Sequence, residues 1–207
     1  DVNGNSDKTE KVNRDQVLIN LNAPEVLLTN QIATEYNDKG SLVVSPQIAE
    51  VEQTDETVKI GIQMKNNYVK VLGVIPFEGN TNVLNGENLN SEFTTEMVDG
   101  GIEIPENLNG KINIYYSENE KADKDLQKES NGWKLAENVN NWNNIKMFLI
   151  DFKDESISVG EEVTFYYKIR IPENINYNKI TYSHYGIEYT LNTAEGKFKM
   201  QAQPTKL

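Results

Sequence analysis

The chain of 207 residues contains no cysteine and a single histidine, His184. The absence of cysteine excludes thiol catalysis, disulfide bonds and cysteine-ligated zinc or iron–sulfur sites. A serine–histidine–aspartate triad would have to use His184, but Ser183 lies on the opposite face of the same predicted strand, so a structural histidine is favoured. No stretch of the sequence is apolar enough to span a membrane or to act as a signal peptide.

Basic residues are also scarce, because 20 Lys and Arg face 32 Asp and Glu and give a formal net charge of -12. Charge of this sign repels phosphate backbones and anionic lipid surfaces. We therefore expect no nucleic acid partner and no direct membrane contact. Ten tyrosines, six phenylalanines and two tryptophans are too many for a disordered chain. A folded protein is expected despite a mean hydropathy of -0.62.

The hydrophobic pattern is that of β-strands. Val163, Phe165, Tyr167, Ile169 and Ile171 occupy alternate positions, which is the pattern of a half-buried antiparallel strand. Clusters of Asn, Gly and Pro separate segments of this kind and supply the turns. The pattern predicts an all-β protein, an antiparallel β-sandwich of immunoglobulin-like or related Greek-key type, with at most one short helix. That helix is expected at 118–128, and the strands at 16–21, 41–45, 58–64, 69–75, 93–98, 111–117, 145–152, 163–171, 182–191 and 197–201.

The domain organisation follows from the same survey. Residues 1–15 are polar and lack periodicity, which predicts a linker or the end of a preceding module. Residues 16–207 contain no internal repeat and no shift in composition that marks a boundary. We therefore expect a single β-sandwich domain over 16–207.

Several short motifs follow one another in a characteristic order. They are Ile-Pro-Phe-Glu-Gly-Asn-Thr at 75–81, Tyr-Tyr-Ser-Glu-Asn at 115–119, Asn-Gly-Trp at 131–133, Ile-Pro at 171–172 followed by Tyr-Asn at 177–178, and Tyr-Ser-His at 182–184. In this order they resemble a β-sandwich module of Gram-positive cell-wall-anchored surface proteins, adhesin-like or pilin-like, which occurs beside collagen-adhesin-type repeats. The resemblance covers most of the chain, from Leu21 to Leu207.

This resemblance implies a non-enzymatic structural or adhesive module that is secreted, extracellular and cell-wall-associated. It transfers no catalytic residue and no cofactor to this chain. The partners that it implies are neighbouring modules of the same chain and a host matrix protein or glycan. The alternative is a carbohydrate-binding module of a secreted enzyme. A β-sandwich hydrolase is a third interpretation, with Glu50/Glu52 or Glu161/Glu162 as its carboxylates, although solvent-facing charges are the favoured reading of these pairs.

The first residues of the chain are candidate calcium ligands. Asp1, Asn3, Asn5 and Asp7 offer oxygen atoms at alternating positions, as an EF-hand-like loop does. They also resemble the calcium-binding start of B-type repeats in staphylococcal surface proteins. However, Ser6 stands where the loop requires glycine and Val12 where it requires a bidentate glutamate. A solvated linker is therefore favoured, with Ca²⁺ as the one candidate ion.

An intramolecular crosslink is a second candidate. Asp151 shares a predicted strand face with Met147 and Leu149, which would place an acid at the edge of the core. The collagen-adhesin-type sandwiches that the chain resembles use such an acid to promote a Lys-to-Asn isopeptide bond, because a desolvated carboxyl can shuttle protons. Lys59 and Asn192 are the candidate reactants. An Asp151 side chain in water is the favoured reading.

Trp133 and Trp142 are the candidate ligand-binding residues. An exposed indole offers a flat apolar face to a sugar ring or to a peptide side chain. Both tryptophans lie in turn-rich sequence, at 131–133 and 138–144. Aromatic residues beside loops also commonly cap a sandwich core, and this is the favoured reading of both.

Overall fold

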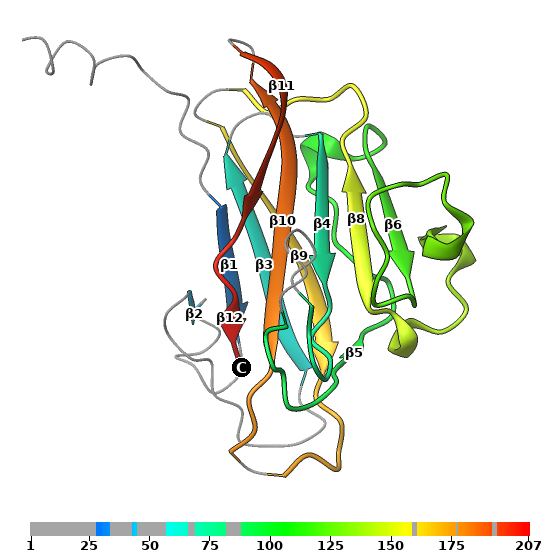
Figure 1. Cartoon of the computed structure of the whole chain (residues 1–207), viewed down its shortest axis with the longest axis vertical. Helices are drawn as coiled ribbons and strands as arrows, with labels where there is room; N and C mark the ends of the chain where they lie inside the picture. Colours follow the sequence, from blue (N-terminus) through cyan, green and yellow to red (C-terminus); the bar gives the residue numbers. More distant parts are fainter. Residues whose placement is uncertain are drawn as a thin grey trace, which may run out of the picture.

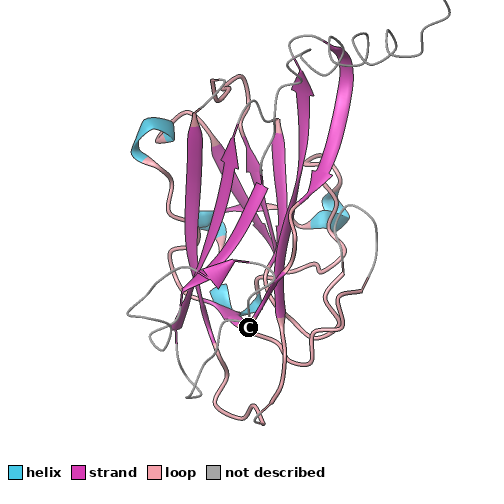
Figure 2. Ribbon diagram, turned by 90° about the vertical axis from the view of Figure 1, so that its left-hand side faces the viewer, coloured by secondary structure: helices cyan, strands magenta, loops and turns pink. Residues whose placement is uncertain are grey.

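The computed structural model describes residues 28–33, 43–44, 57–65, 69–81, 88–158, 161–176, 178–191 and 194–207. This part of the chain forms two antiparallel sheets and no α-helix (Figures 1 and 2). Its helical turns are four 3₁₀ turns of three residues each, and none is long or apolar enough to cross a membrane. The predicted all-β antiparallel sandwich is confirmed.

The smaller sheet contains five strands in the order β2-β1-β3-β9-β5. Its central pair is the longest ladder of the protein, running from Thr57 opposite Arg170 to Lys65 opposite Glu162. The alternation in the sequence explains this pair, because the odd-numbered residues of β9 from Val163 to Ile169 are buried and the others are not. The strands are β1 Leu28–Ala33, β2 Val43–Val44, β3 Thr57–Lys65, β5 Glu96–Met97 and β9 Glu162–Arg170.

The larger sheet contains seven strands in the order β11-β10-β4-β8-β6-β7, with β12 also paired to β10. β4 and β8 are buried on both faces over most of their length. Their sequences are therefore short apolar runs without polar–apolar alternation. The strands are β4 Lys70–Val74, β6 Asn113–Ser117, β7 Lys134–Leu135, β8 Met147–Asp151, β10 Tyr182–Leu191, β11 Ala194–Gln201 and β12 Thr205–Lys206.

The main core lies between the two sheets. Aromatic pairs link the layers, with the ring of Phe148 in the larger sheet 5.4 Å from that of Tyr167 in the smaller one. Tyr185 of β10 also crosses the core, and its hydroxyl donates to the backbone oxygens of Gln63 at 2.7 Å and of Thr29 at 3.0 Å. A buried phenol thus satisfies its polar group on the opposite sheet, which fixes how the sheets face one another.

Gly73 of β4 is required by the packing of Phe148. A Cβ atom at position 73 would lie 1.9 Å from Cζ of that ring. A glycine inside a strand commonly marks such a close approach. The fully buried phenylalanine therefore occupies the space that a side chain at position 73 would need.

The expected helix at 118–128 is wrong. Asn119, Asp123 and Asp125 each accept a hydrogen bond from the backbone N–H two residues later, all at 2.9 Å. These local bonds compete with helical hydrogen bonding and produce successive turns instead.

The other expected elements compare as follows. Nine of the expected strands correspond to observed ones, some of them shorter, while 16–21 lies outside the described residues. The sequence did not predict β1, β7 and β12. The predicted linker at 1–15 also lies outside the described residues.

Candidate functional site

A second hydrophobic cluster lies on the outer face of the larger sheet. We call it the outer cluster. Alternate residues of β4 and β8 point away from the main core and would face water if nothing covered them. The segment 118–133, here the cap loop, covers them and contributes Ala122, Leu126 and Trp133. The buried members of the outer cluster are Leu72, Val74, Phe77, Ala122, Met147 and Leu149, and Tyr115, Leu126 and Trp133 pack against them.

The cap loop is organised around Asn131, whose side chain is 1% exposed. Its Nδ2 donates to Oδ1 of Asp123 at 2.7 Å and to the backbone oxygens of Asp125 at 2.8 Å and Asp123 at 3.2 Å. Its Oδ1 accepts from the Asp123 N–H at 3.2 Å. One amide therefore satisfies four polar contacts within a loop that has no regular backbone ladder.

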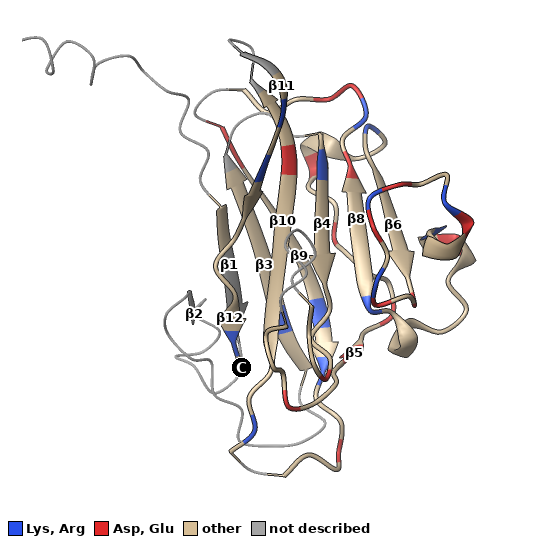
Figure 3. Cartoon of the chain, in the orientation of Figure 1, with Lys and Arg blue, Asp and Glu red and all other residues tan. Residues whose placement is uncertain are grey.

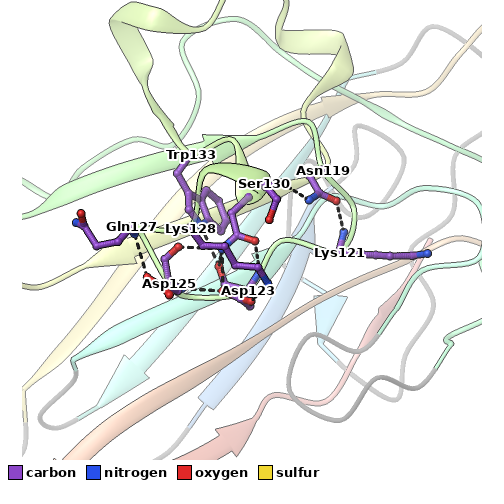
Figure 4. A network of polar contacts seen from close by, with 9 residues as sticks. Asn119, Lys121, Asp123, Asp125, Gln127, Lys128, Ser130 and Trp133 are labelled. Atoms are coloured by element: carbon purple, nitrogen blue, oxygen red, sulfur yellow. Dashed lines mark hydrogen bonds and ion pairs between the residues drawn. The ribbon is translucent and has the colours of Figure 1, made fainter.

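Asp123 is the second centre of this network (Figure 4). Its Oδ2 lies 2.6 Å from Nζ of Lys128. The hydrogen bond from Lys128, followed by those from the Asp125 N–H and the Asn131 amide, lowers the pKa of Asp123 to about 2. The carboxylate is thus ionised at neutral pH and fully engaged in holding the loop.

Trp133 closes the cap loop over the outer cluster. Its side chain is half-buried, and Nε1 donates to the backbone oxygen of Asp123 at 2.9 Å. Figure 4 shows the indole beside the polar network of the loop. The indole therefore has both an apolar and a polar role within the fold.

Trp142 is anchored elsewhere. It packs against the main core, and its ring meets Tyr116 edge to face at 4.8 Å. The Tyr116 hydroxyl accepts from the Ile102 N–H at 2.9 Å, and burial raises the pKa of this phenol to about 12. The two tryptophans thus belong to different hydrophobic clusters, and each is tied to the fold by contacts of its own. Their proposed ligand role stays a prediction.

Two of the three predicted crosslink residues, Lys59 and Asp151, lie on opposite outer faces of the sandwich. Lys59 lies on the outer face of the smaller sheet, with Nζ 3.9 Å from the centre of the Tyr166 ring. Asp151 lies on the outer face of the larger sheet, and its Oδ1 accepts from the Lys153 N–H at 3.2 Å. The main core separates these two faces, so Asp151 cannot act on Lys59 in this arrangement. Asn192 lies outside the described residues.

The metal candidates and the histidine are placed as follows. Asp1, Asn3, Asn5 and Asp7 lie outside the described residues, so calcium stays a prediction. Among the residues that the structure describes, no three acidic or histidine side chains gather as metal ligands. His184 is 1% exposed, and burial lowers its pKa to about 4.

Ser183 and the acid pair Glu161/Glu162 form hydrogen bonds within the fold. Ser183 lies 2.9 Å from the Tyr167 hydroxyl, inside the core. Glu161 accepts from the Ser158 N–H at 3.1 Å, and Glu162 accepts from the side chain of Gln63. Glu50 and Glu52 lie outside the described residues.

Sequence reasoning missed the polar centre of the cap loop. Asn131 stands before Gly132 and reads as an ordinary turn residue, and nothing in its neighbourhood signals burial. The only available signal was the spacing of Asn119, Asp123 and Asp125, which favours side-chain-to-backbone turns over a helix.

No protein-family model matches this chain, and no curated protein matches it. The solved structures that are similar to it include the following two. One is a protein from Corynebacterium diphtheriae described as membrane anchored, with a TM-score of 0.47 and 13% identity over 89% of this chain. The other is BcpA, the major pilin subunit of Bacillus cereus, with a TM-score of 0.39 and 10% identity over 88% of this chain. The chain spans 36% and 39% of the lengths of these two proteins.

Proposed function

We propose that this chain is a non-catalytic, load-bearing structural module of an extracellular, cell-wall-associated bacterial protein. The observation that carries the proposal is the antiparallel pairing of β1 with β3 in one sheet and of β12 with β10 in the other. β1 begins at Leu28 opposite Met64, and the chain finishes at Leu207, which exchanges two backbone hydrogen bonds with Thr181. In Figure 1 β1 begins above the chain end marked C, so the two positions are separated along the long axis of the sandwich.

The strand register explains this separation. Glu188 of β10 pairs with Lys70, which follows β3 after a short connection, so this end of β10 lies near the start of β1. Six residues earlier along β10, Tyr182 pairs with Lys206 of β12. At about 3.3 Å per residue, six residues of strand correspond to roughly 20 Å.

This arrangement suits a module under tension. A force that pulls Leu28 and Leu207 apart runs along the strands and loads the hydrogen bonds of β1 with β3 and of β12 with β10 together. Bonds loaded together must fail together, whereas bonds loaded from one end fail in succession. Resistance to pulling is governed by the barrier to unfolding, so loading many bonds at once raises it.

Non-catalytic character is supported by the chemistry of the described residues. The single histidine is buried in the sheet with a low pKa, and Ser183 is engaged with Tyr167. The cap-loop acid Asp123 has a low pKa and is engaged with Lys128, so it is not a proton donor near neutral pH. These three groups stabilise the fold, and none of the three is arranged as a general acid, a general base or a nucleophile.

A glycan and matrix-protein array tests the structural role against an adhesive one. We expect no ligand to bind above background. Micromolar binding that is abolished by Trp133→Ala at unchanged stability would contradict the structural role and favour an adhesin or a carbohydrate-binding module.

A further inference from the structure

Four lysines gather around one buried acid on the outer face of the larger sheet. Glu188 of β10 pairs in register with Lys70 of β4 on one side and with Lys199 of β11 on the other. Residues directly opposite each other on neighbouring strands project to the same face, with Cβ atoms about 5 Å apart. Lys197 of β11 and Lys124 of the cap loop complete the group, here called the lysine cluster. Figure 3 shows basic positions of β11 and β4 in blue on either side of an acidic position of β10 in red.

Glu188 holds this cluster together. The residue is 4% exposed, and its carboxylate forms ion pairs with Lys124 and, at 3.3 Å, with Lys197. The ammonium group of Lys70 lies 3.5 Å from the backbone oxygen of Lys124. A buried carboxylate that fixes two lysines reduces the entropy that their head groups would lose on binding a ligand.

The cluster carries more positive than negative charge. Burial lowers the pKa of Lys124, and repulsion from the nearby charges of Lys199, Lys197 and Lys70 lowers it further. Glu188 compensates one of these four charges.

Two other carboxylates lie near the cluster, and one of them has a cationic partner of its own. Asp123 is paired with Lys128 at 2.6 Å, and Asp151, opposite Lys70 on β8, accepts from the Lys153 N–H. A hydrogen bond from a neutral N–H does not cancel the charge of Asp151, so Asp151 and Glu188 together offset two of the four lysine charges. An excess of two positive charges therefore remains at the cluster, in a protein whose net charge is -12.

The net negative charge of the protein does not prevent an anion from binding at this face. At physiological ionic strength, charges more than about 8 Å away are largely screened, so an anion beside the cluster experiences mainly the local lysines. The side chains of Lys197 and Lys124 are 62% and 38% exposed, so their ammonium groups can be reached from solvent. The local field thus favours an anion that carries several charges.

We propose that the lysine cluster is a binding site for a multivalent phosphate anion. Lysine binds phosphate as a point charge, and several lysines acting on one anion sum contacts that are individually weak. A single carboxylate would supply only part of the missing negative charge, whereas a chain of phosphate groups supplies several negative charges at once. The site is independent of the load-bearing role, because it lies on the outer face and uses none of the bonds between β1 and β3.

Isothermal titration of the intact chain with inorganic tripolyphosphate tests this site. We expect saturable binding that weakens as salt is raised. Lys197→Gln with Lys199→Gln should weaken it about tenfold, since two partly exposed ion pairs of up to ~1 kcal/mol each are lost. The control is Lys111→Gln with Lys168→Gln, which removes the same charge from elsewhere on the surface and should leave binding unchanged.

A second variant separates a loss of binding from a loss of folding. Lys199→Gln alone keeps both ion pairs of Glu188, so the fold should survive and binding should still weaken. A glycerol phosphate polymer distinguishes a phosphodiester source from free polyphosphate, and saturable binding of either supports the site. Absence of saturable binding, equal weakening in the control pair, or equally tight binding of citrate would overturn the assignment to phosphate.

Discussion

Asn131 donates a hydrogen bond from Nδ2 to Oδ1 of Asp123 at 2.7 Å, and this contact is the centre of the cap loop. Because Asn131 is buried and makes three further side-chain hydrogen bonds, Asn131→Ala leaves several polar groups without partners. We expect a loss of about 2 to 3 kcal/mol in the free energy of unfolding, measured in urea. The exposed Asn138 is the matched control, and Asn138→Ala should change stability by less than about 0.5 kcal/mol.

The cap loop shows both what the sequence could reveal and what it could not. Short-range side-chain-to-backbone bonds replaced the expected helix at 118–128, and they were implicit in the positions of Asn119, Asp123 and Asp125. The burial of Asn131 depends on the outer face of a sheet whose strands are distant in sequence, so no local pattern could predict it.

The strands also fall into those that the sequence predicts and those that it does not. β9 was predictable because one face is buried and the other is not, and this leaves a period of two in the sequence. β1 has the sequence Leu-Thr-Asn-Gln-Ile-Ala, without clear alternation, and becomes a strand by pairing with β3. β7 and β12 have two residues each, too few for any periodicity. The lysine cluster depends on cross-strand register, which a single sequence does not display.

The second prediction concerns Trp133. Trp133→Ala should cost about 3 kcal/mol of stability, because the indole covers the outer cluster and leaves a cavity when removed. Trp133→Phe keeps an aromatic ring but loses the bond from Nε1 to the Asp123 oxygen, so about 1 kcal/mol is expected. In a Trp142→Phe background, a neutral quencher should reduce the remaining tryptophan fluorescence only weakly. Strong quenching together with an unchanged unfolding midpoint in Trp133→Ala would show that this indole is a surface group.

The third prediction concerns His184 and pH. Burial lowers its pKa from 6.5 to about 4, so between these values the unfolded chain binds a proton that the folded chain does not. Its contribution to stability is therefore complete above about pH 6.5 and is lost as the pH falls toward 4. Because the chain has one histidine, a single imidazole signal in a proton NMR titration reports its pKa directly.

His184→Gln is the control for that pH dependence. It should flatten the decline in stability above the range in which carboxylates titrate. An imidazole signal that titrates near 6.5 in the folded protein would be incompatible with a buried neutral His184.

The fourth prediction compares two glycines with positive φ. Gly101 has φ +68°, and a Cβ there would lie 2.4 Å from the Tyr116 hydroxyl oxygen and 2.8 Å from the Trp142 ring, whereas Gly110 has φ +76° and open space around it. Gly110→Ala should cost about 1 kcal/mol for backbone strain alone. Gly101→Ala should cost about 2 kcal/mol more, because the aromatic pair must move. Equal losses in the two variants, measured by thermal unfolding, would mean that the Tyr116–Trp142 contact does not constrain this turn.

The load-bearing role is tested most directly by pulling single molecules along two different axes. The absence of native cysteine allows attachment through introduced thiols alone. The first variant carries two cysteines, one in place of Leu28 and one added after Leu207. The control variant carries Thr57→Cys and Arg170→Cys, at two residues that face each other at one end of the β3–β9 ladder. The account predicts a clearly higher unfolding force for the first axis, which loads β1 and β12 along their length, than for the second, which separates one ladder from its end. An equal or lower force along the first axis would contradict the load-bearing role.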